Sequence, residues 1–337
     1  MTTEGGCPPT LWLDAHAVGE IFTRELALQS QRTAFAALGA GTAVMPGKLV
    51  TPSPSGQSMA LTYTAQLSAD SGPVTKFTAV HPRNPERGLA TITATVIALD
   101  ADTGCVSAVL DGTTITTRRT AAATALAVSL LANEGPTALT VFGSGVQARE
   151  HVLAVAAVRQ LTSVRVAGRD AEKAHALELE LSTQLGIAPQ PQLDAETAVR
   201  ESTLVILCTT SHDPVIEAAW IRPGSLVVSV GSFEPDRHEV GTDTIARADV
   251  VVVDDPETAS VHAGPIIAAL ESGTVERASL LGLGPCIVGS AVARTSAEQI
   301  VFYNTTGLGI QDAAAAWAII DVARTRGVGA PTWSGVG

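Results

Sequence analysis

An α/β fold with a doubly wound parallel sheet is predicted by three features of the sequence. From about Thr137 onward, short apolar runs alternate with stretches of helical composition. A glycine-rich loop, Gly143-Ser144-Gly145-Val146-Gln147-Ala148, separates the first of these runs from the helical stretch that follows it. Before residue 130, β-branched segments bounded by turn residues indicate a separate region with an antiparallel or mixed sheet.

Length and composition limit the classes of protein to which the chain can belong. Its 337 residues are enough for two ordinary domains with a sizeable core. The hydrophobic fraction is 46% and the aromatic fraction only 4%, which favours helices packed tightly on a parallel sheet. The formal net charge of -12 argues against nucleic acid as a partner, so any site that binds an anion must be local.

The sequence shows no signal-peptide pattern, no membrane-spanning run and no closely spaced cysteines, and these absences bear on the location and on the role of the cysteines. Residues 1–9 contain neither a basic region nor an apolar core, and apolar runs are interrupted well before membrane-spanning length. We therefore expect a soluble, cytoplasmic protein that does not bind membranes. Because the cysteines are widely spaced and form no CxxC pair, we expect neither a disulfide framework nor a metal site; they are Cys7, Cys105, Cys208 and Cys286.

The first region is expected to begin with a short apolar segment and a helix, and to continue as strands. Leu11-Trp12-Leu13 is followed by a helical spacing of apolar residues up to about residue 40. Residues 59–64 and 91–99 are rich in β-branched side chains, which indicates strands. Hairpin-like turns are expected at Asp102-Thr103-Gly104 and Asp111-Gly112, and helical composition returns at Arg119–Ala132.

The second region is expected to supply the parallel sheet. Each predicted strand is a short apolar run, and helix-like stretches separate the runs. The strands are Ala138–Phe142, Ser163–Ala167, Leu204–Cys208, Leu226–Val230 and Val250–Val253, with a further one at Ile300–Tyr303. The stretch Gly307–Arg324 then predicts a long, Ala-rich helix.

The glycine-rich loop matches the G-x-G-x-x-G/A fingerprint of the dinucleotide-binding Rossmann fold. It follows an apolar strand and opens a helix, which is the context that the fingerprint requires. Gly143 permits the tight turn, Gly145 lets the backbone approach a pyrophosphate, and Ala148 lets the helix pack closely on the strand. We expect a nicotinamide cofactor to bind at Gly143, Ser144, Gly145, Val146, Gln147 and Ala148; the alternative is a structural glycine turn in another α/β protein.

The end of the second strand of this region bears on the choice of cofactor. NAD enzymes tend to place an acidic residue there, where it binds the ribose hydroxyls. This chain has Gly168-Arg169-Asp170, and the planar guanidinium of Arg169 can pair with a 2′-phosphate. We expect these three residues to bind the cofactor and favour NADPH, while Asp170, one place later, leaves NADH open.

Two cationic residues in the first region are candidates for binding a substrate. Lys76 lies in a β-like, largely apolar stretch, and Arg119 lies at the start of an apolar helix. A cation within an apolar segment is unfavourable unless it is paired. A substrate carboxylate is one suitable partner, and a structural ion pair or an extended surface side chain is the alternative.

Together, these features resemble the ornithine cyclodeaminase/μ-crystallin family. The matching stretches run through nearly the whole chain in the family's order, and Arg119-Thr120-Ala121-Ala122 combined with the Gly-x-Gly-x-Gln-Ala loop is specific to it. The other matching stretches are Lys76 with His81-Pro82-Arg83-Asn84 and Gly88, Asp111-Gly112, Ile115-Thr116, Val230-Gly231-Ser232, Pro235, Glu239, and Thr306-Gly307-Leu308-Gly309-Ile310-Gln311-Asp312.

The resemblance implies a homodimer with two domains and an active site in the cleft between them. Residues 1–130 and 304–337 would form a discontinuous α+β domain for substrate binding and dimerisation, and residues 131–303 a Rossmann NAD(P)-binding domain. Family members include ornithine cyclodeaminases, alanine dehydrogenases and ketimine reductases. The resemblance also implies that Lys76 and Arg119 are catalytic and hold the substrate carboxylate near the nicotinamide.

Two departures from the family pattern bear on the substrate. A family arginine that binds the carboxylate aligns with Lys48, which keeps the charge but loses the bidentate fork. In the cyclodeaminases a carboxylate that acts on the substrate amine follows the glycine pair after the fourth Rossmann strand. Here Gly231-Ser232 is followed by Phe233, which cannot exchange protons. Phe233 therefore argues against cyclodeamination and favours a flat, apolar pocket for a small ring.

Further site residues are expected at the carboxyl ends of the strands, because ligands bind there in doubly wound sheets. Thr209, Thr210, Val230 and Ser232 are candidates for binding the cofactor. Thr306 and Gly307 start the last predicted helix, and their backbone N–H groups are expected to face the cofactor or the substrate.

The predicted function is reduction by NAD(P)H of a small cyclic imino acid to the L-amino acid. Δ1-Pyrroline-2-carboxylate and Δ1-piperideine-2-carboxylate are the expected substrates, with Lys76 as a carboxylate ligand, a proton donor, or both. An amino-acid dehydrogenase of the alanine type, or another reductase of open-chain imino acids, is the main alternative. An ornithine cyclodeaminase and a protein that binds NADPH without turnover also stay open.

Overall fold

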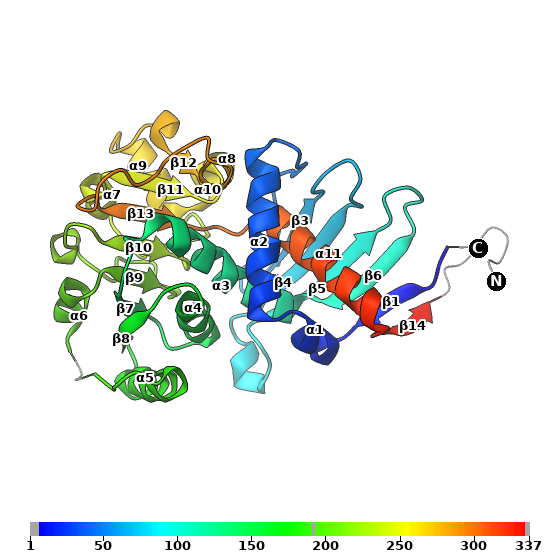
Figure 1. Ribbon diagram of the computed structural model, residues 1–337, viewed down its shortest axis with the longest axis horizontal. Coiled ribbons are helices and arrows are strands. Elements are labelled where there is room, and N and C mark those ends of the chain that lie inside the picture. The colour runs from blue at the N-terminus through cyan, green and yellow to red at the C-terminus, as the bar shows by residue number, and fades with distance from the viewer. Residues whose placement is uncertain (1–6, 191–192, 334–337) are drawn as a thin grey trace. The chain divides into compact units, whose positions relative to one another are not determined.

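The computed structural model describes residues 7–190 and 193–333. These residues form two compact units, which Figure 1 shows by residue colour. Unit 1 contains the chain up to Arg119 and again from Leu308, and unit 2 contains Thr120–Gly307. The sequence analysis placed these divisions after residues 130 and 303. The first division lies earlier, inside helix α3 (Gly112–Leu131), because this one helix runs from unit 1 into unit 2.

Unit 1 is built on a seven-stranded mixed sheet with the strand order β14-β1-β6-β5-β4-β3-β2. Neighbouring strands are antiparallel except for β1 and β6, which are parallel. The strands are β1 (Thr10–Leu13), β2 (Leu49–Pro52), β3 (Met59–Ala65), β4 (Val74–Val80), β5 (Ile92–Leu99), β6 (Val106–Asp111) and β14 (Ala330–Trp333). The sheet is mixed, as the β-branched segments of this region predict.

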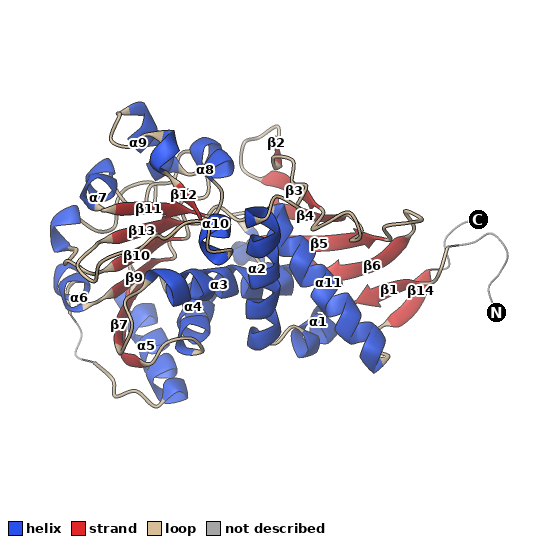
Figure 2. Ribbon diagram, turned by 45° about the horizontal axis from the view of Figure 1, so that its top comes forward, coloured by secondary structure: helices blue, strands red, loops and turns tan. Residues whose placement is uncertain are grey.

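Three helices cover the sheet of unit 1 on one side, as the ribbon in Figure 2 shows. Helix α11 (Gly309–Arg326) packs on β3, β4 and β5, and α2 (Arg24–Gly39) packs on α11. Helix α1 (Ala15–Ile21) contacts β1 and β6, and a 3₁₀ turn, η1 (Asn84–Arg87), follows β4. The C-terminal helix therefore completes a unit that begins at the N-terminus.

The alternation of side chains along β4 decides which residues face the helices. Lys76 lies opposite Tyr63 on β3 and Val96 on β5, and all three side chains are buried. Phe77, the next residue, points to the other face of the sheet and is 56% exposed. The pleat of one strand thus places Lys76 on the face that α11 covers.

Unit 2 contains a seven-stranded sheet, with the order β12-β11-β13-β10-β9-β7-β8, in which every pair of neighbours is parallel. The strands are β7 (Thr137–Phe142), β8 (Leu161–Ala167), β9 (Leu204–Leu207), β10 (Leu226–Ser229), β11 (Val250–Val253), β12 (Leu281–Gly282) and β13 (Val301–Asn304). The helical elements are α4 (Val146–Ala156), α5 (Ala171–Leu185), α6 (Ala195–Glu201), η2 (Ala218–Trp220), α7 (Thr242–Arg247), α8 (Pro256–His262), α9 (Gly264–Glu271), η3 (Arg277–Ser279) and α10 (Leu283–Ile287). This sheet confirms the predicted α/β class.

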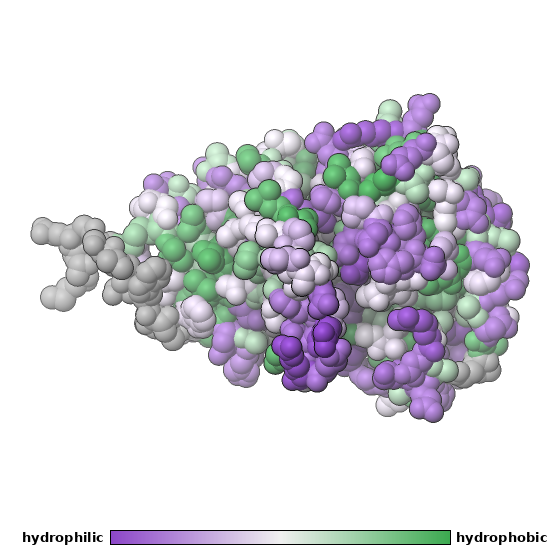
Figure 3. All heavy atoms as spheres, turned by 180° about the vertical axis from the view of Figure 1, so that it is seen from behind, coloured by the Kyte–Doolittle hydropathy of each residue, from purple (hydrophilic) through white to green (hydrophobic). Residues whose placement is uncertain are grey.

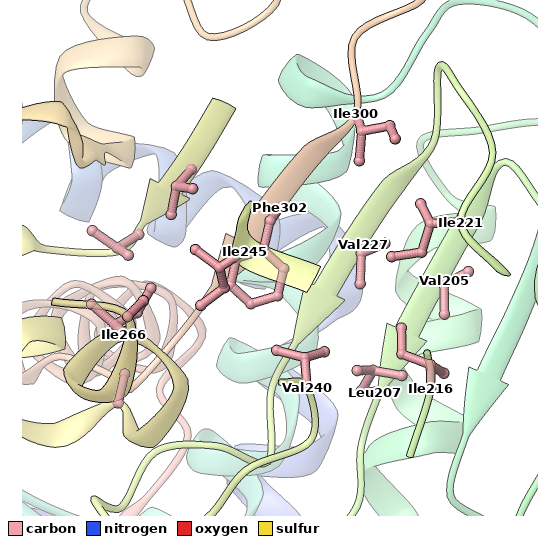
Figure 4. Close-up of a cluster of buried hydrophobic side chains, with 14 of the residues drawn as sticks. Val205, Leu207, Ile216, Ile221, Val227, Val240, Ile245, Ile266, Ile300 and Phe302 are labelled. Atoms are coloured by element: carbon pink, nitrogen blue, oxygen red, sulfur yellow. The ribbon is translucent and has the colours of Figure 1, made fainter. Parts of the chain in front are cut away.

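The core of unit 2 lies against this parallel sheet. Figure 4 shows Val205, Val227 and Phe302, from the adjacent strands β9, β10 and β13, with isoleucines of the surrounding segments packed against them. Strands that are buried on both faces must be apolar at successive positions, which explains why they appear in the sequence as continuous runs of Val, Leu and Ile. The strands that carry these buried side chains pair in register, so their carboxyl ends lie beside one another at the same edge of the sheet.

The expectation of a hairpin at Asp111-Gly112 was wrong. Strand β6 ends at Asp111 and helix α3 begins at Gly112, seven positions before the predicted start at Arg119. The Asp111 Oδ2 atom accepts a hydrogen bond from the backbone N–H of Thr114 at 2.8 Å. An Asp-Gly pair serves either a turn or the start of a helix, and here the side chain of Asp111 caps the helix.

The expectation that the cysteines do not pair was also wrong for two of them. Cys7 and Cys105 form a disulfide between residues that are 98 positions apart in the sequence. Cys7 lies shortly before β1 and Cys105 lies directly before β6, and these two strands are parallel neighbours. Parallel pairing brings the starts of two strands together, so the sheet creates a proximity that cysteine spacing does not reveal.

The described part of the chain has neither a membrane-spanning helix nor a cluster of metal-binding side chains. Within residues 7–190 and 193–333, no helix combines the length and the apolar character needed to cross a membrane. Within the same ranges, no three side chains of His, Cys, Asp or Glu are arranged to hold a metal ion.

Candidate functional site

A buried cluster of charges in unit 1 joins three elements that lie far apart in the sequence. The Nζ atom of Lys76, on β4, lies 2.8 Å from Oδ2 of Asp312, and Nε of Arg119, on α3, lies 3.0 Å from Oδ1 of the same carboxylate. All three side chains are at most 5% exposed. One carboxylate of α11 therefore bridges two cations, each through its own oxygen atom.

Neighbouring groups orient the two cations further. The Arg119 Nη1 atom donates to Oε1 of Gln311 at 3.2 Å, and this same oxygen accepts the backbone N–H of Leu308 at 2.8 Å. The Lys76 ammonium lies 4.4 Å from the centre of the Tyr63 ring, within the range of a cation–π contact. The first turn of α11 thus presents Gln311 and Asp312 together toward the sheet.

The electrostatics of the cluster act mainly on Lys76. Burial lowers its pKa to about 8 from the ordinary 10.5, the charge of Arg119 and more weakly that of Lys48 lower it as well, and Asp312 raises it. Lys48 therefore lies within electrostatic reach of Lys76. The three cations singled out in the sequence are brought into one region of unit 1.

The charge balance of this cluster suits an anionic ligand. Lys76 and Arg119 carry two positive charges when both are protonated and Asp312 carries one negative charge, so the buried group retains an excess of positive charge. An organic carboxylate can compensate this excess, and a guanidinium and an ammonium can bind it with charge-assisted hydrogen bonds. The excess is local, because the chain as a whole has a net charge of -12.

Asp312 and Gln311 are the residues of this site to which the sequence analysis assigned no role. A partner for Lys76 and Arg119 was expected, either a substrate or a structural ion pair, and the structure provides the ion pair. The signal in the sequence was a Gln-Asp pair at the start of an otherwise Ala-rich, apolar helix. A charged residue on the buried side of such a helix requires a partner of opposite charge.

The phosphate loop of unit 2 has the backbone geometry that a dinucleotide requires. Gly143 has a φ of +113°, and a Cβ atom at this position would lie 2.5 Å from the carbonyl oxygen of Cys208. Gly145 precedes α4, and a Cβ atom there would meet nothing within 4 Å, so the backbone is open to a ligand. Ala148 is fully buried against the sheet. The first N–H groups of α4 are therefore directed at a place where a pyrophosphate fits.

Arg169 and Asp170 have different environments at the end of β8. The Oδ1 atom of Asp170 accepts the backbone N–H of Lys173 at 3.1 Å, and its Oδ2 atom lies 2.9 Å from the Lys173 ammonium. Asp170 therefore caps helix α5, and this N–H donor lowers the pKa of its carboxyl. Arg169, between Gly168 and Asp170, is exposed.

The loops after β9 and β10 hold the remaining cofactor candidates. Thr209 donates both its N–H and its hydroxyl to Oε1 of Glu239, and the hydroxyl of Ser232 accepts the N–H of Glu239 at 2.9 Å. Thr210 is exposed and Val230 is buried. The hydroxyls of Thr209 and Ser232 are thus engaged within the protein, whereas the side chain of Thr210 is exposed.

Phe233 lies against the guanidinium of Arg237, which pairs with Glu234 of the same loop. The guanidinium carbon of Arg237 lies 4.7 Å from the centre of the Phe233 ring, and Nε of Arg237 lies 2.9 Å from Glu234 Oε2. The nearby carboxylate of Glu234 is therefore paired with Arg237.

The expected role of the N–H groups of Thr306 and Gly307 needs correction. Both groups donate to Oδ2 of Asp254, at 2.6 and 2.8 Å, and the hydroxyl of Thr306 also bonds this carboxylate. Asp254 follows β11 and is fully buried, and burial raises its pKa while these hydrogen bonds lower it. The N–H groups are satisfied by an internal anion, so they do not face a ligand.

The residues predicted for the two ligands lie in different units. Lys48, Lys76 and Arg119 belong to unit 1, whereas the phosphate loop, Gly168–Asp170 and the loops after β9 and β10 belong to unit 2. Phe233, Thr306 and Gly307, which were predicted to bind the substrate, also belong to unit 2. Unit 1 thus contains the cations predicted to bind the substrate carboxylate, and unit 2 contains the residues predicted to bind the cofactor together with three that were predicted to bind the substrate.

Comparison with known proteins identifies relatives along most of the chain. The family model described as ornithine cyclodeaminase/mu-crystallin family matches residues 10–327. A protein of Azospirillum brasilense named Δ1-pyrroline-2-carboxylate/Δ1-piperideine-2-carboxylate reductase is 38% identical over 237 residues, which are 70% of this chain and 74% of that protein.

Two solved structures are similar over the whole fold. One is a Δ1-pyrroline-2-carboxylate reductase of Thermococcus litoralis in complex with NADH and L-proline, with a TM-score of 0.90 at 28% identity, covering 95% of this chain and 99% of that one. The other is an archaeal alanine dehydrogenase dimer with bound NAD, with a TM-score of 0.89 at 29% identity, covering 96% and 98% of the two chains. These findings confirm the predicted family, the fold class and the enzyme class, an NAD(P)-dependent oxidoreductase that acts on imino or amino acids.

The role of Asp312 in holding the buried cations can be tested by replacing it with Asn. Asp312→Asn leaves two buried cations without a counterion, so we expect the free energy of unfolding to fall by about 3 to 5 kcal/mol. The pKa of Lys76 should fall below about 8, since Asp312 is the charge that raises it. Denaturant titration measures the first effect, and nitrogen-15 NMR of the lysine side chains measures the second.

A matched control for this variant lies on the same helix. Asp321 is an exposed residue of α11, so Asp321→Asn should leave both the stability and the pKa of Lys76 within error of the wild type. Equal behaviour of the two variants would show that Asp312 does not hold the cluster.

Proposed function

The chain belongs to the ornithine cyclodeaminase/mu-crystallin family, and we propose that it reduces a small cyclic imino acid to the L-amino acid with a nicotinamide cofactor. The observation that carries this proposal is the buried excess of positive charge around Lys76 and Arg119, which suits a substrate carboxylate. Relatives named as reductases of Δ1-pyrroline-2-carboxylate and Δ1-piperideine-2-carboxylate support the same substrate class.

Binding and orientation are the tasks of unit 1 in this proposal. Arg119 and Lys76 hold the substrate carboxylate, with Lys48 as a further cation near it, and Asp312 keeps both buried cations in position. Because two cations bind one carboxylate, the small ring that carries it cannot rotate freely. This fixes which face of the C=N carbon is turned toward the nicotinamide. The reduced nicotinamide supplies the hydride, and its phosphates fit the loop from Gly143 to Ala148.

A proton is also needed, because reduction of an imine adds a hydride to carbon and a proton to nitrogen. With a pKa of about 8, Lys76 is protonated at neutral pH and releases its proton more readily than an ordinary lysine. Lys76 is therefore suited to supply this proton as well as to bind the carboxylate. Phe233 carries no titratable group, so the loop after β10 presents no carboxylate at that position to act on a substrate amine.

An amino-acid dehydrogenase is the second candidate function. The archaeal alanine dehydrogenase structure has the same fold and a similar coverage of the chain, and its substrate also carries a carboxylate that the cluster suits. The two functions differ in the source of nitrogen: a cyclic imine contains it, whereas an oxo acid requires ammonia. Dependence of the reaction on ammonium therefore separates them.

We propose NADPH as the preferred cofactor and the cytoplasm as the place of the reaction. Arg169 is exposed at the end of β8, and the neighbouring carboxylate of Asp170 is already engaged as the cap of α5. A 2′-phosphate at this point would gain a guanidinium partner and meet a carboxylate that is already paired with Lys173.

A homodimer through the open face of the unit 1 sheet is also part of the proposal. The strand register aligns mainly uncharged side chains across this face, with Asp111 opposite Thr95 at the end of β6, and three of its apolar residues are about half exposed or more: Trp12, Leu49 and Phe77. Figure 3 views the molecule from behind and shows hydrophobic side chains gathered on this part of the surface. Apolar patches on a sheet face mark interaction sites, and the dimer of the related alanine dehydrogenase supports a second copy as the partner.

The substrate class can be tested with a panel of imines. We expect the purified protein to oxidise NADPH with Δ1-pyrroline-2-carboxylate or Δ1-piperideine-2-carboxylate in the absence of ammonium, and to form L-proline or L-pipecolate. Absorbance at the nicotinamide band and chiral analysis of the product provide the measurement. Oxidation of NADPH with pyruvate only when ammonium is present would support the dehydrogenase instead, and no oxidation with either cyclic imine would overturn the proposed reaction.

The cofactor preference can be tested with Arg169→Ala. Loss of a charge-assisted hydrogen bond to the 2′-phosphate should lower kcat/KM for NADPH about 10- to 100-fold, while kcat/KM for NADH stays within about twofold. Arg222→Ala is the matched control, because it removes an exposed arginine of unit 2 that precedes β10, away from the carboxyl ends of the strands. An unchanged NADPH to NADH ratio in Arg169→Ala would remove the phosphate role from this residue.

The dimer interface can be tested with Phe77→Asp. A charge in the centre of an apolar interface is strongly unfavourable, so we expect this variant to be a monomer in light scattering at concentrations where the wild type is a dimer. Val261→Asp places the same charge on an exposed valine of unit 2 and should leave the dimer intact. If Phe77→Asp stays dimeric, the interface lies elsewhere.

A further inference from the structure

Glu239 is a buried carboxylate in the loop between β10 and α7. It accepts four hydrogen bonds, two on each oxygen atom. Oε1 accepts the N–H of Thr209 at 2.6 Å and its hydroxyl at 2.9 Å, and Oε2 accepts the hydroxyl of Ser229 and the N–H of Gly231, both at 2.7 Å. Each oxygen therefore faces a backbone N–H, a donor that cannot reverse its role.

The backbone of Glu239 is fixed as well, so the carboxylate has little freedom to move. Its N–H donates to the hydroxyl of Ser232 at 2.9 Å, and its carbonyl oxygen accepts the N–H of Val215 at 2.9 Å. The side chain is fully buried. Because both its side chain and its backbone are hydrogen-bonded, Glu239 can fix the positions of the loops that donate to its carboxylate.

The groups that Glu239 joins lie at the carboxyl ends of two neighbouring strands. Thr209 follows β9 and Gly231 follows β10, and the two strands pair in parallel with Leu207 opposite Ser229. A Cβ atom on Gly231 would lie 1.9 Å from the carbonyl oxygen of Thr209 and 2.7 Å from Oε1 of Glu239. The two loops and the carboxylate are therefore packed more closely than any side chain at position 231 would allow.

The same loop of β9 also contacts the phosphate loop. The carbonyl oxygen of Cys208 lies close to Gly143, where a Cβ atom would be 2.5 Å from it. Cys208 directly precedes Thr209. The segment Cys208–Thr209 thus has the phosphate loop on one side and Glu239 on the other. The ends of β7, β9 and β10 form one continuous set of backbone contacts.

The strand order indicates which part of a dinucleotide these loops serve. In a doubly wound sheet the two nucleotide halves bind on opposite sides of the point where the strand order reverses. Here that point lies between β7 and β9: β8 follows β7 on one side, and β9 and β10 lie on the other. The first half serves the nucleotide that contacts Arg169, which is the adenosine half, so the loops joined by Glu239 serve the nicotinamide half.

We propose that Glu239 is a positioning residue of the cofactor site, whose carboxylate sets the spacing of the loops after β9 and β10 for the nicotinamide nucleotide. This inference rests on the proposed use of a nicotinamide cofactor. Glu239 does not touch the cofactor in this account. It acts through the backbone of Thr209 and Gly231, and its effect is confined to one half of the ligand.

The test uses Glu239→Gln, which preserves the shape of the side chain. A glutamine presents an NH₂ group to one of the two backbone N–H donors, so one loop must move away from the other. We expect the Kd of NADPH and of NADH to rise about tenfold or more, and the Kd of 2′,5′-ADP and of ADP, which fill only the adenosine half, to stay within about twofold. Isothermal titration calorimetry on the full-length protein measures all four ligands.

Glu178→Gln is the matched control in the same unit. Glu178 is also buried, and its Oε2 accepts the N–H of Val166 on β8 at 2.9 Å, on the adenosine side of the sheet. This variant also replaces a buried carboxylate by an amide, but its amide oxygen can still accept the Val166 N–H, so it should not weaken NADPH relative to 2′,5′-ADP. Ser229→Ala, which removes one neutral donor from Glu239 and keeps the carboxylate, should weaken NADPH in the same selective way but less, and it carries the test if Glu239→Gln does not fold.

The outcomes separate this inference from the proposed function. Equal weakening of NADPH and 2′,5′-ADP, or unchanged NADPH binding, would overturn the positioning role of Glu239 while the proposed function stands. Failure of the wild type to bind either NADH or NADPH would overturn the proposed function, and the inference with it.

Discussion

The carboxylate of Asp312, shared between Lys76 and Arg119, is the interaction on which the architecture of unit 1 depends. It joins α11 to β4 and to α3, and the whole of unit 2 separates α11 from the other two contacts in the sequence. Buried ion pairs contribute little net stability, but removing one partner is strongly unfavourable. The interaction therefore specifies how α11 packs on the sheet. The excess of positive charge that remains on Lys76 and Arg119 suits a bound carboxylate.

Unit 2 depends on a different constraint, the close approach of backbone segments at the carboxyl edge of its sheet. Gly143 accommodates the carbonyl of Cys208, and Gly231 accommodates the carbonyl of Thr209. Contacts of this kind need glycine at both positions, since a Cβ atom would overlap the neighbouring carbonyl. Buried carboxylates, Glu239 and Asp254, then satisfy the N–H groups that such turns leave without partners in the sheet.

The two constraints divide the proposed work between the units. Unit 1 supplies fixed cations for a small acid, and unit 2 supplies a shaped backbone for a dinucleotide. Neither arrangement requires a metal ion or a covalent intermediate, because hydride addition to an imine needs mainly orientation and a proton. The low pKa of Lys76, which results from burial next to Arg119, fits the second requirement.

Prediction from the sequence succeeded where a local pattern has one physical solution. Continuous runs of Val, Leu and Ile mark strands buried on both faces, and a Gly-x-Gly loop after such a strand marks the tight turn that opens a helix. It failed where one pattern serves two structures. Asp111-Gly112 was expected to form a hairpin and instead starts α3, because the Asp111 side chain caps the helix. Thr306 and Gly307 were expected to face a ligand, and the carboxylate of Asp254 binds them instead.

The sequence by itself determined the fold class and the family, and it proposed the glycine loop and the two cations as site residues, since each rests on residues that are adjacent or regularly spaced. Only the tertiary structure decided the partners of those residues: Asp312 for Lys76 and Arg119, Glu239 for Thr209 and Gly231, and Cys105 for Cys7. The physical reason is that parallel strands and returning helices bring together residues whose distance in the sequence carries no information about their distance in space. A buried charge shows in the sequence that a partner must exist, and the packing of the chain decides which residue it is.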